Sequence, residues 1–338
     1  MGRVPAILLT VATVAFSLSV PGGLGAAAAG TTWTVTVGAD SPDHAVQLLD
    51  YYPRMITVDA GDTVTFTNGA TVEHTVAFFS GAKPPALAAP EPDGRVRFPS
   101  SVAFPGGGPA YDGTGVVNSG LLAGDHKSWT LTFTKPGRYT YQCLLHPAQV
   151  GTMVVQPAGT PYPKTQAQYD QLAAQARAQG LAAGAKLQSA NRTAAFAGEH
   201  GTIWTASLVG DAKQRIAIYT FGTSPLTVKV GDTVRWVMKD PDEIHTVTFP
   251  GTGQVPAFIV PQPQSETPPK LYYNPAVLKP AGGADHKGNA YYNSGLLVPF
   301  NPPGPDEYSL TFTQPGTFTY WCVVHVPEGM RGTVVVTP

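Results

Sequence analysis

Residues 320–332 read Tyr-Trp-Cys-Val-Val-His-Val-Pro-Glu-Gly-Met-Arg-Gly, and residues 141–151 read Tyr-Gln-Cys-Leu-Leu-His-Pro-Ala-Gln-Val-Gly. Each stretch places a Cys three positions before a His, at the end of a segment that alternates aromatic and polar residues. If the chain turns there between two strands, these side chains can surround one metal ion. Thiolate, imidazole and a weak thioether are the ligands of a type 1 copper centre. The two stretches therefore predict a metal site at the end of each of two β-domains.

The sequence around these stretches is duplicated. Residues 58–64 match residues 228–234, and Asn118 to Leu122 recurs unchanged as Asn293 to Leu297. The offset grows from 170 to 179 residues along the chain, a period too long for a solenoid. We therefore expect two copies of one domain.

The composition favours an all-β protein. Charged residues make up only 13% of the 338-residue chain, and Gly and Pro are abundant with 37 and 33 copies. Short segments of alternating polarity separated by Pro-Gly turns are typical of a β-sandwich or barrel. A net charge of −1 offers no basic excess for phosphates and argues against a nucleic-acid binder.

The domain organisation follows from these observations. We expect a signal peptide at 1–29, a first domain at 30–157, a linker with a helix at 158–200 and a second domain at 201–338. Pro/Gly-rich stretches at about 81–115 and 250–290 are expected to form surface loops over the sandwiches, along paths that the sequence leaves open.

The N-terminal segment predicts export. Arg3 precedes an apolar stretch, and an Ala run at 26–29 offers a cleavage site. The alternative is a membrane anchor, for which the apolar stretch is short. We expect an exported, extracellular, periplasmic or cell-envelope protein that is not inserted in a membrane after cleavage.

The linker predicts one helix. Thr165 and Gln168 fit a capping box, and an Ala/Gln-rich run continues to about Ser189 with a weak point at Gly180. Four residues could lie along a sandwich: Tyr169, Leu172, Ala173 and Ala176. The helix is interpreted as a semi-rigid spacer, with a partner-docking helix as the alternative.

Each copy also contains a distant His that can complete its site. His74 and His245 occupy matching places, each followed by Thr-Val, and each shares a strand face with apolar residues. A His in such a place is often a hydrogen-bonded core residue. Its recurrence in both copies beside a Cys/His pair favours a metal ligand.

The chain resembles two tandem cupredoxins, the blue-copper family that includes plastocyanin, amicyanin and pseudoazurin. The resemblance covers nearly all of the chain except the linker and the N-terminal segment. It implies two Greek-key β-sandwich domains, copper near one end of each, and one-electron transfer. In the second copy it implies the ligands His245, Cys322, His325 and Met330.

Two departures from the family pattern matter. The separation from His to Cys is 69 residues in the first copy and 77 in the second, longer than a small cupredoxin needs. Thr75 and Thr246 follow the first His where the family often has Asn, so we expect the Cys sulfur to be hydrogen-bonded differently.

The first copy offers His74, Cys143, His146 and Gln149. Aligned on the glycines that follow each site, Gln149 takes the place of Met330, whereas Met153 falls opposite Val334 inside a strand. An axial Gln is an accepted substitute for Met. A first site without copper is the alternative.

The two cysteines have a different alternative interpretation. In an exported protein a pair of Cys normally forms a disulfide. Here each one sits in a complete ligand motif, and a bridge would destroy both sites. We therefore expect two free thiols.

Three functions remain open. The first is an electron carrier with two type 1 coppers that exchanges electrons with redox proteins. The second is a multicopper oxidase or nitrite-reductase-like enzyme, which would need additional copper held by several histidines, although no His-x-His pair occurs. The third is copper trafficking or storage, which favours Met- or Cys-rich sites.

Two expectations concern the histidines. His146 and His325 should reach the surface inside an apolar patch that serves brief docking with a redox protein; its residues are Leu144, Leu145, Pro147, Val326 and Pro327. The remaining histidines are interpreted as surface or loop residues: His44, His126, His200 and His286.

Overall fold

The structure is a computed structural model that describes residues 30–262, 267–299 and 305–338. The predicted signal peptide at 1–29, and the alternative of a membrane anchor there, lie outside the described residues. In the described part, no helix is long and apolar enough to cross a membrane.

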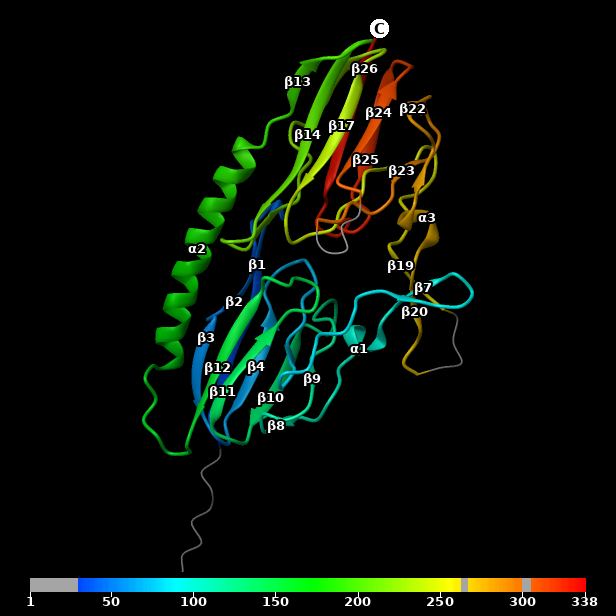
Figure 1. Ribbon diagram of the computed structural model, residues 1–338. Helices are drawn as coiled ribbons and strands as arrows, with labels where there is room; N and C mark the ends of the chain where they lie inside the picture. The colour runs from blue at the N-terminus through cyan, green and yellow to red at the C-terminus, as the bar shows by residue number, and fades with distance from the viewer. Residues whose placement is uncertain (1–29, 263–266, 300–304) are drawn as a thin grey trace, which may run out of the picture.

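Two β-sandwiches lie end to end, and one eleven-stranded sheet runs through both (Figure 1). Its order is β22-β24-β17-β14-β15-β2-β1-β4-β10-β8, with β13 paired to β14. The first sandwich contributes β1 (Thr32–Asp40), β2 (Val46–Tyr52), β4 (Thr63–Asn68), β8 (Ala110–Tyr111) and β10 (Ser128–Phe133). The second contributes β13 (Ala194–Ala197), β14 (Thr202–Asp211), β15 (Ile216–Ile218), β17 (Thr233–Lys239), β22 (Asp285–His286) and β24 (Glu307–Phe312).

A further sheet closes each sandwich. The first has the order β3 (Met55–Asp59), β12 (Val150–Gln156), β11 (Gly137–Gln142), β5 (Ala77–Phe78) and β9 (Val117–Asn118). The second has the order β16 (Leu226–Lys229), β26 (Arg331–Thr337), β25 (Gly316–Trp321), β18 (Thr248–Phe249), β23 (Tyr292–Ser294) and β21 (Pro280–Ala281). The predicted all-β class with two sandwiches is confirmed.

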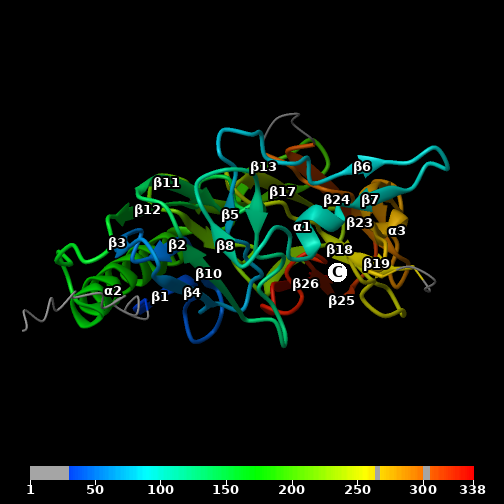
Figure 2. The same cartoon turned by 90° about the horizontal axis from the view of Figure 1, so that it is seen from below.

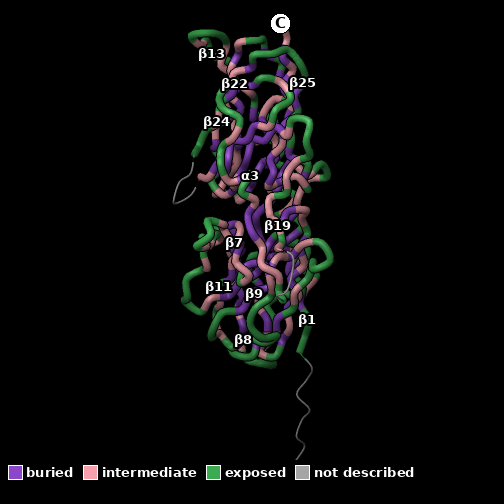
Figure 3. The backbone as a smooth tube through the Cα atoms, turned by 90° about the vertical axis from the view of Figure 1, so that its right-hand side faces the viewer, coloured by how far each residue is buried: buried purple, intermediate pink, exposed green. Residues whose placement is uncertain are grey.

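The cores follow from strand alternation. In β4, Val64 and Phe66 are fully buried, whereas the threonines between them face outward. In β17, Val234 and Trp236 are buried in the same way. Period-2 burial sends every second side chain between the two sheets, and the buried segments run through both sandwiches (Figure 3).

The predicted helix is present as α2 (Gln166–Ala190), and Thr165 and Gln168 form its capping box. Its interpretation as a spacer is wrong. The helix packs along β2 and β15, so it covers the junction of the two sandwiches (Figure 1). All seven residues of β2 are consequently buried.

Small residues allow this close packing. Gly184 is buried, and a Cβ there would lie 2.2 Å from Val46 Cγ1. Gly180 also lies against β2 and does not interrupt the helix. Tyr169 and Ala173 are buried as expected, whereas Leu172 and Ala176 are exposed.

The two long loops meet each other between the domains, whereas we expected each to lie over its own sandwich. They form one four-stranded sheet with the order β19 (Ile259–Pro261), β20 (Leu271–Tyr273), β7 (Val96–Phe98) and β6 (Ala89–Pro90). Two short helices accompany it, α1 (Ser100–Ala103) and α3 (Pro275–Leu278). Figure 2 shows β6 and β7 of the first loop beside α3 of the second.

Candidate metal centres

The first site forms where three segments of the first sandwich converge. His74 precedes β5 and makes an isolated antiparallel bridge with Leu122. Cys143 follows β11 directly, and His146 lies in the turn before β12. The Gln149 N–H donates to the His146 carbonyl at 2.9 Å. The turn between two paired strands thus brings the Cys and the second His beside the first.

The second site has the same local construction. His245 bridges Leu297, Cys322 follows β25, and the Met330 N–H donates to the His325 carbonyl at 3.1 Å. The Cys322 N–H donates to the Met330 carbonyl at 3.0 Å, as the Cys143 N–H does to that of Gln149 at the same distance. Gln149 and Met330 therefore occupy equivalent backbone positions.

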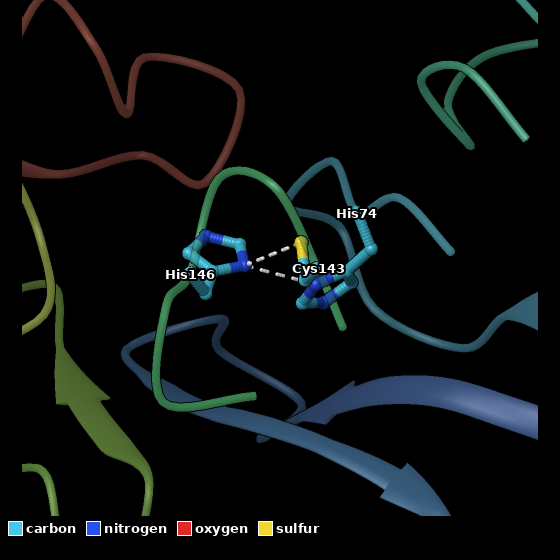
Figure 4. Close-up of side chains that lie close together, drawn as sticks. All are labelled: His74, Cys143 and His146. Atoms are coloured by element: carbon cyan, nitrogen blue, oxygen red, sulfur yellow. Dashed lines mark hydrogen bonds between the residues drawn. The ribbon is translucent and has the colours of Figure 1, made fainter. Parts of the chain in front are cut away.

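Three potential ligand atoms face one another in each site. In the first, His146 Nδ1 lies 3.1 Å from His74 Nδ1 and 3.4 Å from Cys143 Sγ (Figure 4). In the second, Cys322 Sγ lies 3.6 Å from His245 Nδ1 and 3.4 Å from His325 Nδ1. The centre of such a triangle is about 2 Å from each corner, which is the length of a metal–imidazole bond.

The chemistry of these donors fits copper. Burial opposes ionisation of Cys143, but positive charge and hydrogen bonds from His146 and His74 outweigh it, so the pKa of the thiol lies well below its ordinary value. The pKa of Cys322 is lowered in the same way by His325 and His245. A buried thiolate beside two imidazoles is a donor set that suits a soft thiolate-binding ion such as copper.

The fourth residue differs between the sites. Gln149 Oε1 lies 3.3 Å from His146 Nδ1, and its Nε2 donates to the Asp50 carbonyl at 3.0 Å. The amide oxygen is therefore held toward the site. Met330 is fully buried within the core of the second sandwich. Met153 lies in β12 opposite Tyr139, as Val334 lies opposite Phe318, so Met153 is a core residue.

The threonines after the first histidines organise both sulfurs. The Thr75 N–H donates to Cys143 Sγ at 3.3 Å, and the Thr246 N–H donates to Cys322 Sγ at 3.4 Å. The Thr75 hydroxyl accepts from the Leu144 N–H at 2.7 Å, and the Thr246 hydroxyl accepts from the Val323 N–H at 2.8 Å. A hydrogen bond to sulfur stabilises its negative charge.

The expected exposure of two histidines is wrong. His146 is 3% exposed and His325 is 2% exposed, because the two sites face each other across the domain interface. Both histidines and Leu145 line a cavity of about 230 Å³ between the domains, to which the long loops contribute Phe258 and Leu271. Of the predicted patch residues, Leu144 and Leu145 pack with Tyr273 of the second long loop, whereas Pro147 and Pro327 are exposed.

One buried carboxylate joins the two sites. Glu243 Oε1 lies 3.1 Å from His146 Nε2, and its Oε2 lies 3.5 Å from His325 Nε2. The Tyr219 hydroxyl donates to Glu243 Oε1 at 3.0 Å, and the Tyr219 ring stacks on His325 at 3.9 Å. Burial raises the pKa of Glu243, but positive charge at His146 and its hydrogen bonds outweigh this, so that pKa lies well below its ordinary value.

Sequence reasoning missed Glu243 and Tyr219. The available signal was a Glu two residues before His245, where the first copy has Val72. The sequence around Glu243 does not indicate that Glu243 contacts His146, because His146 lies almost a hundred residues away in the other domain.

The remaining residues behave mostly as expected. Both cysteines are free, so the disulfide alternative is wrong. His126 and His200 are exposed, and His44 is partly exposed beside Asp40. His286 is only 1% exposed, so its assignment to the surface is wrong. It packs among four aromatic rings: Phe249, Tyr292, Phe312 and Phe318.

Comparison with known proteins identifies the first sandwich. Residues 37–156 match the model of a family described as copper binding proteins, plastocyanin/azurin family. The first sandwich is a cupredoxin. The second is cupredoxin-like, since its strands repeat the order of the first and its site repeats the His-Cys-His geometry.

Three individual relatives each match between 33% and 40% of this chain. The chloroplastic plastocyanin of Physcomitrium patens is 28% identical over 113 residues, which is 33% of this chain and 50% of the relative. The chain thus spans about half the length of that relative. Oxidized plastocyanin from Dryopteris crassirhizoma is 26% identical and covers 36% of this chain and 99% of its own, with a TM-score of 0.23. A Met-to-Gln mutant of amicyanin in the Cu(I) form is 25% identical, and the match covers 40% of this chain and 82% of the amicyanin chain, with a TM-score of 0.23.

Proposed function

We propose that the protein is an exported electron carrier with two type 1 copper centres, one in each cupredoxin domain. The first centre is assigned to His74, Cys143, His146 and Gln149. The second is assigned to His245, Cys322, His325 and Met330. The observation that carries the proposal is the buried triangle of one thiol and two imidazole nitrogens, present in each domain at the same place in the fold.

Bound copper would supply a one-electron redox couple. The chain supplies the ligands, the hydrogen bonds to sulfur and a buried environment. The Cys thiolates would bind the copper ions, and the Thr75 and Thr246 N–H groups donate to these sulfurs. The His imidazoles present Nδ1 inward, where burial excludes water. The paired strands on either side hold these groups in one arrangement, so little reorganisation accompanies a change of charge.

The difference between Gln149 and Met330 supports a direction of electron flow. A thioether favours the softer reduced ion, whereas an amide oxygen favours the oxidised ion. Met330 therefore raises the potential of the second centre relative to the first. Electrons are proposed to enter from a redox protein, pass from the Gln149 domain to the Met330 domain, and leave to a second redox protein.

Copper counting and spectroscopy test the proposal. The copper-loaded full chain is expected to bind two copper ions and to show intense thiolate-to-copper absorption, with two type 1 signals in electron paramagnetic resonance. A further copper without thiolate character would favour the oxidase or reductase alternative. Weak binding of many ions without the absorption band would favour storage.

A further inference from the structure

The two domains are related by an approximate two-fold axis. The strand order of the eleven-stranded sheet gives matching elements when it is followed from either end, and β2 pairs antiparallel with its own counterpart β15. The Leu49 N–H donates to the Arg215 carbonyl and the Tyr219 N–H donates to the Ala45 carbonyl, both at 2.8 Å. The two-fold axis relates these two hydrogen bonds to each other, so Leu49 and Tyr219 occupy equivalent positions in the two domains.

The axis passes between the two candidate centres. In the small interdomain sheet, β7 likewise pairs with its counterpart β20. Two-fold symmetry turns the same end of each sandwich toward the other, so His146 and His325 face each other. A perfectly symmetric interface would place the same side chains on both sides of the axis.

The side chains break this symmetry at Glu243 and at Tyr219. Glu243 stands two residues before His245, and the residue two before His74 is Val72. Tyr219, which donates to Glu243, has Leu49 as its counterpart. Val72 and Leu49 both pack into the core cluster of the second sandwich. Asp240 and Asp242 lie nearby on the same segment, and Glu243 is the carboxylate that contacts histidines of both centres.

One shared carboxylate is physically reasonable there. Glu243 is 5% exposed, and the contacts of its two oxygens with His146 and His325 offset part of the cost of burying its charge. Because each His turns Nδ1 toward its own centre, its Nε2–H remains free to donate. One carboxylate with two oxygens can accept from both imidazoles and fix both rings.

We propose that Glu243 joins the two copper centres into one electron-exchange unit through the connection His146–Glu243–His325. This inference rests on the proposed function. In the exchange step, the first centre loses one electron and is oxidised, and the second gains it and is reduced. Glu243 keeps its charge, no bond is broken and no proton is transferred. Its negative charge stabilises the oxidised state of both centres and so lowers the potential of each.

The test uses the copper-loaded full chain with Glu243→Gln, which keeps the size of the side chain and removes its charge. Exchange between the centres is followed after rapid reduction of one centre, and both potentials are measured by redox titration. We expect slower exchange and a rise of both potentials, with the oxidised-to-reduced ratio at a given potential falling roughly tenfold to a hundredfold in each centre. Glu199→Gln is the control, since Glu199 is 87% exposed, and it should change neither quantity.

Glu243→Asp separates charge from contact. The shorter side chain keeps the charge but cannot reach both imidazoles, so the potentials should stay near those of the wild type while exchange slows. In the copper-free protein, Glu243→Gln should also shift the Nε2–H resonances of both His146 and His325, which needs no bound metal.

The outcomes distinguish the two proposals. If both thiolate absorption bands persist in Glu243→Gln and neither the potentials nor the exchange rate changes, the bridge is overturned and the proposed function stands. A shift confined to one centre would also overturn the bridge. If the wild-type chain shows no thiolate-to-copper band, the proposed function and the bridge both fail.

Discussion

The two domains share one backbone plan and differ in the side chains placed on it. Strand order, the His-Cys-His triangle and the hydrogen bonds to sulfur recur in both. Four differences at matched positions bear on the sites, the interface and the core, in the order first domain and second domain: Gln149 and Met330, Val72 and Glu243, Leu49 and Tyr219, Tyr111 and His286.

This comparison separates what builds a site from what adjusts it. The triangle needs a Cys, two His and the turn that joins β-strands, so both copies retain them. The axial residue, the interface carboxylate and one core residue contact that frame without forming it. Changing them is expected to alter the potential of a centre, the coupling between the centres or the pH dependence of stability, while the sandwiches remain.

The largest expected effect comes from removing a thiolate. Cys143→Ser should abolish the first centre and Cys322→Ser the second, because a hydroxyl does not replace a thiolate as a copper ligand. Each variant should retain the absorption band of the other domain and lose one copper per chain, measured by optical spectroscopy and metal analysis. If Cys143→Ser leaves the spectrum and copper count unchanged, the first site does not hold copper.

Exchanging the axial residues sharpens the comparison. Gln149→Met should raise the potential of the first centre, and Met330→Gln should lower that of the second, each by an amount of order 100 mV, roughly 2 kcal/mol for one electron. Each is measured by redox titration in a chain whose other Cys is Ser. A higher potential for the unmodified Gln149 centre than for the Met330 centre would contradict the proposed direction of flow.

A smaller effect concerns pH. Burial among aromatic rings lowers the pKa of His286 to about 4, below the ordinary value of about 6.5 in the unfolded chain. The folded state therefore keeps His286 neutral. The contribution of this His to the free energy of unfolding is complete above about pH 6.5 and is lost as the pH falls toward 4. At pH 5.5 this loss should be roughly 1 kcal/mol.

His286→Tyr, which introduces the residue of the first domain, should remove that part of the pH dependence. The thermal midpoints of copper-loaded wild type and variant are compared at pH 7.5 and 5.5. His200→Gln is the control, since His200 is 87% exposed. An equal drop in midpoint for wild type and His286→Tyr would refute this account of His286.

Much of each site could be predicted because its parts are local. Cys143, His146 and Gln149 lie within seven residues, and the backbone bond from Cys143 to Gln149 closes the turn. Counting from the shared glycines was therefore enough to match Gln149 with Met330 and to place Met153 in the core. The distant histidines could be found because they recur beside the same short motif.

The contacts between domains could not be predicted in this way. An apolar patch around His146 is equally suited to a separate redox protein and to a sister domain, and both interpretations produce the same sequence pattern. The helix pattern was similarly ambiguous, because Ala and Gly allow either an exposed spacer or close packing on β2.

The sequence by itself determined the two sandwiches, the two His-Cys-His sets and the difference between Gln149 and Met330, since these follow from strand periodicity, from the short Cys-to-His spacing and from the internal repeat. Only the tertiary structure decided that the two sites face each other, that both long loops close over them, and that Glu243 contacts His146 and His325. The physical reason is that docking depends on the shape and charge of whole surfaces. Those surfaces are assembled from segments far apart in the chain, so no local pattern records which surface they meet.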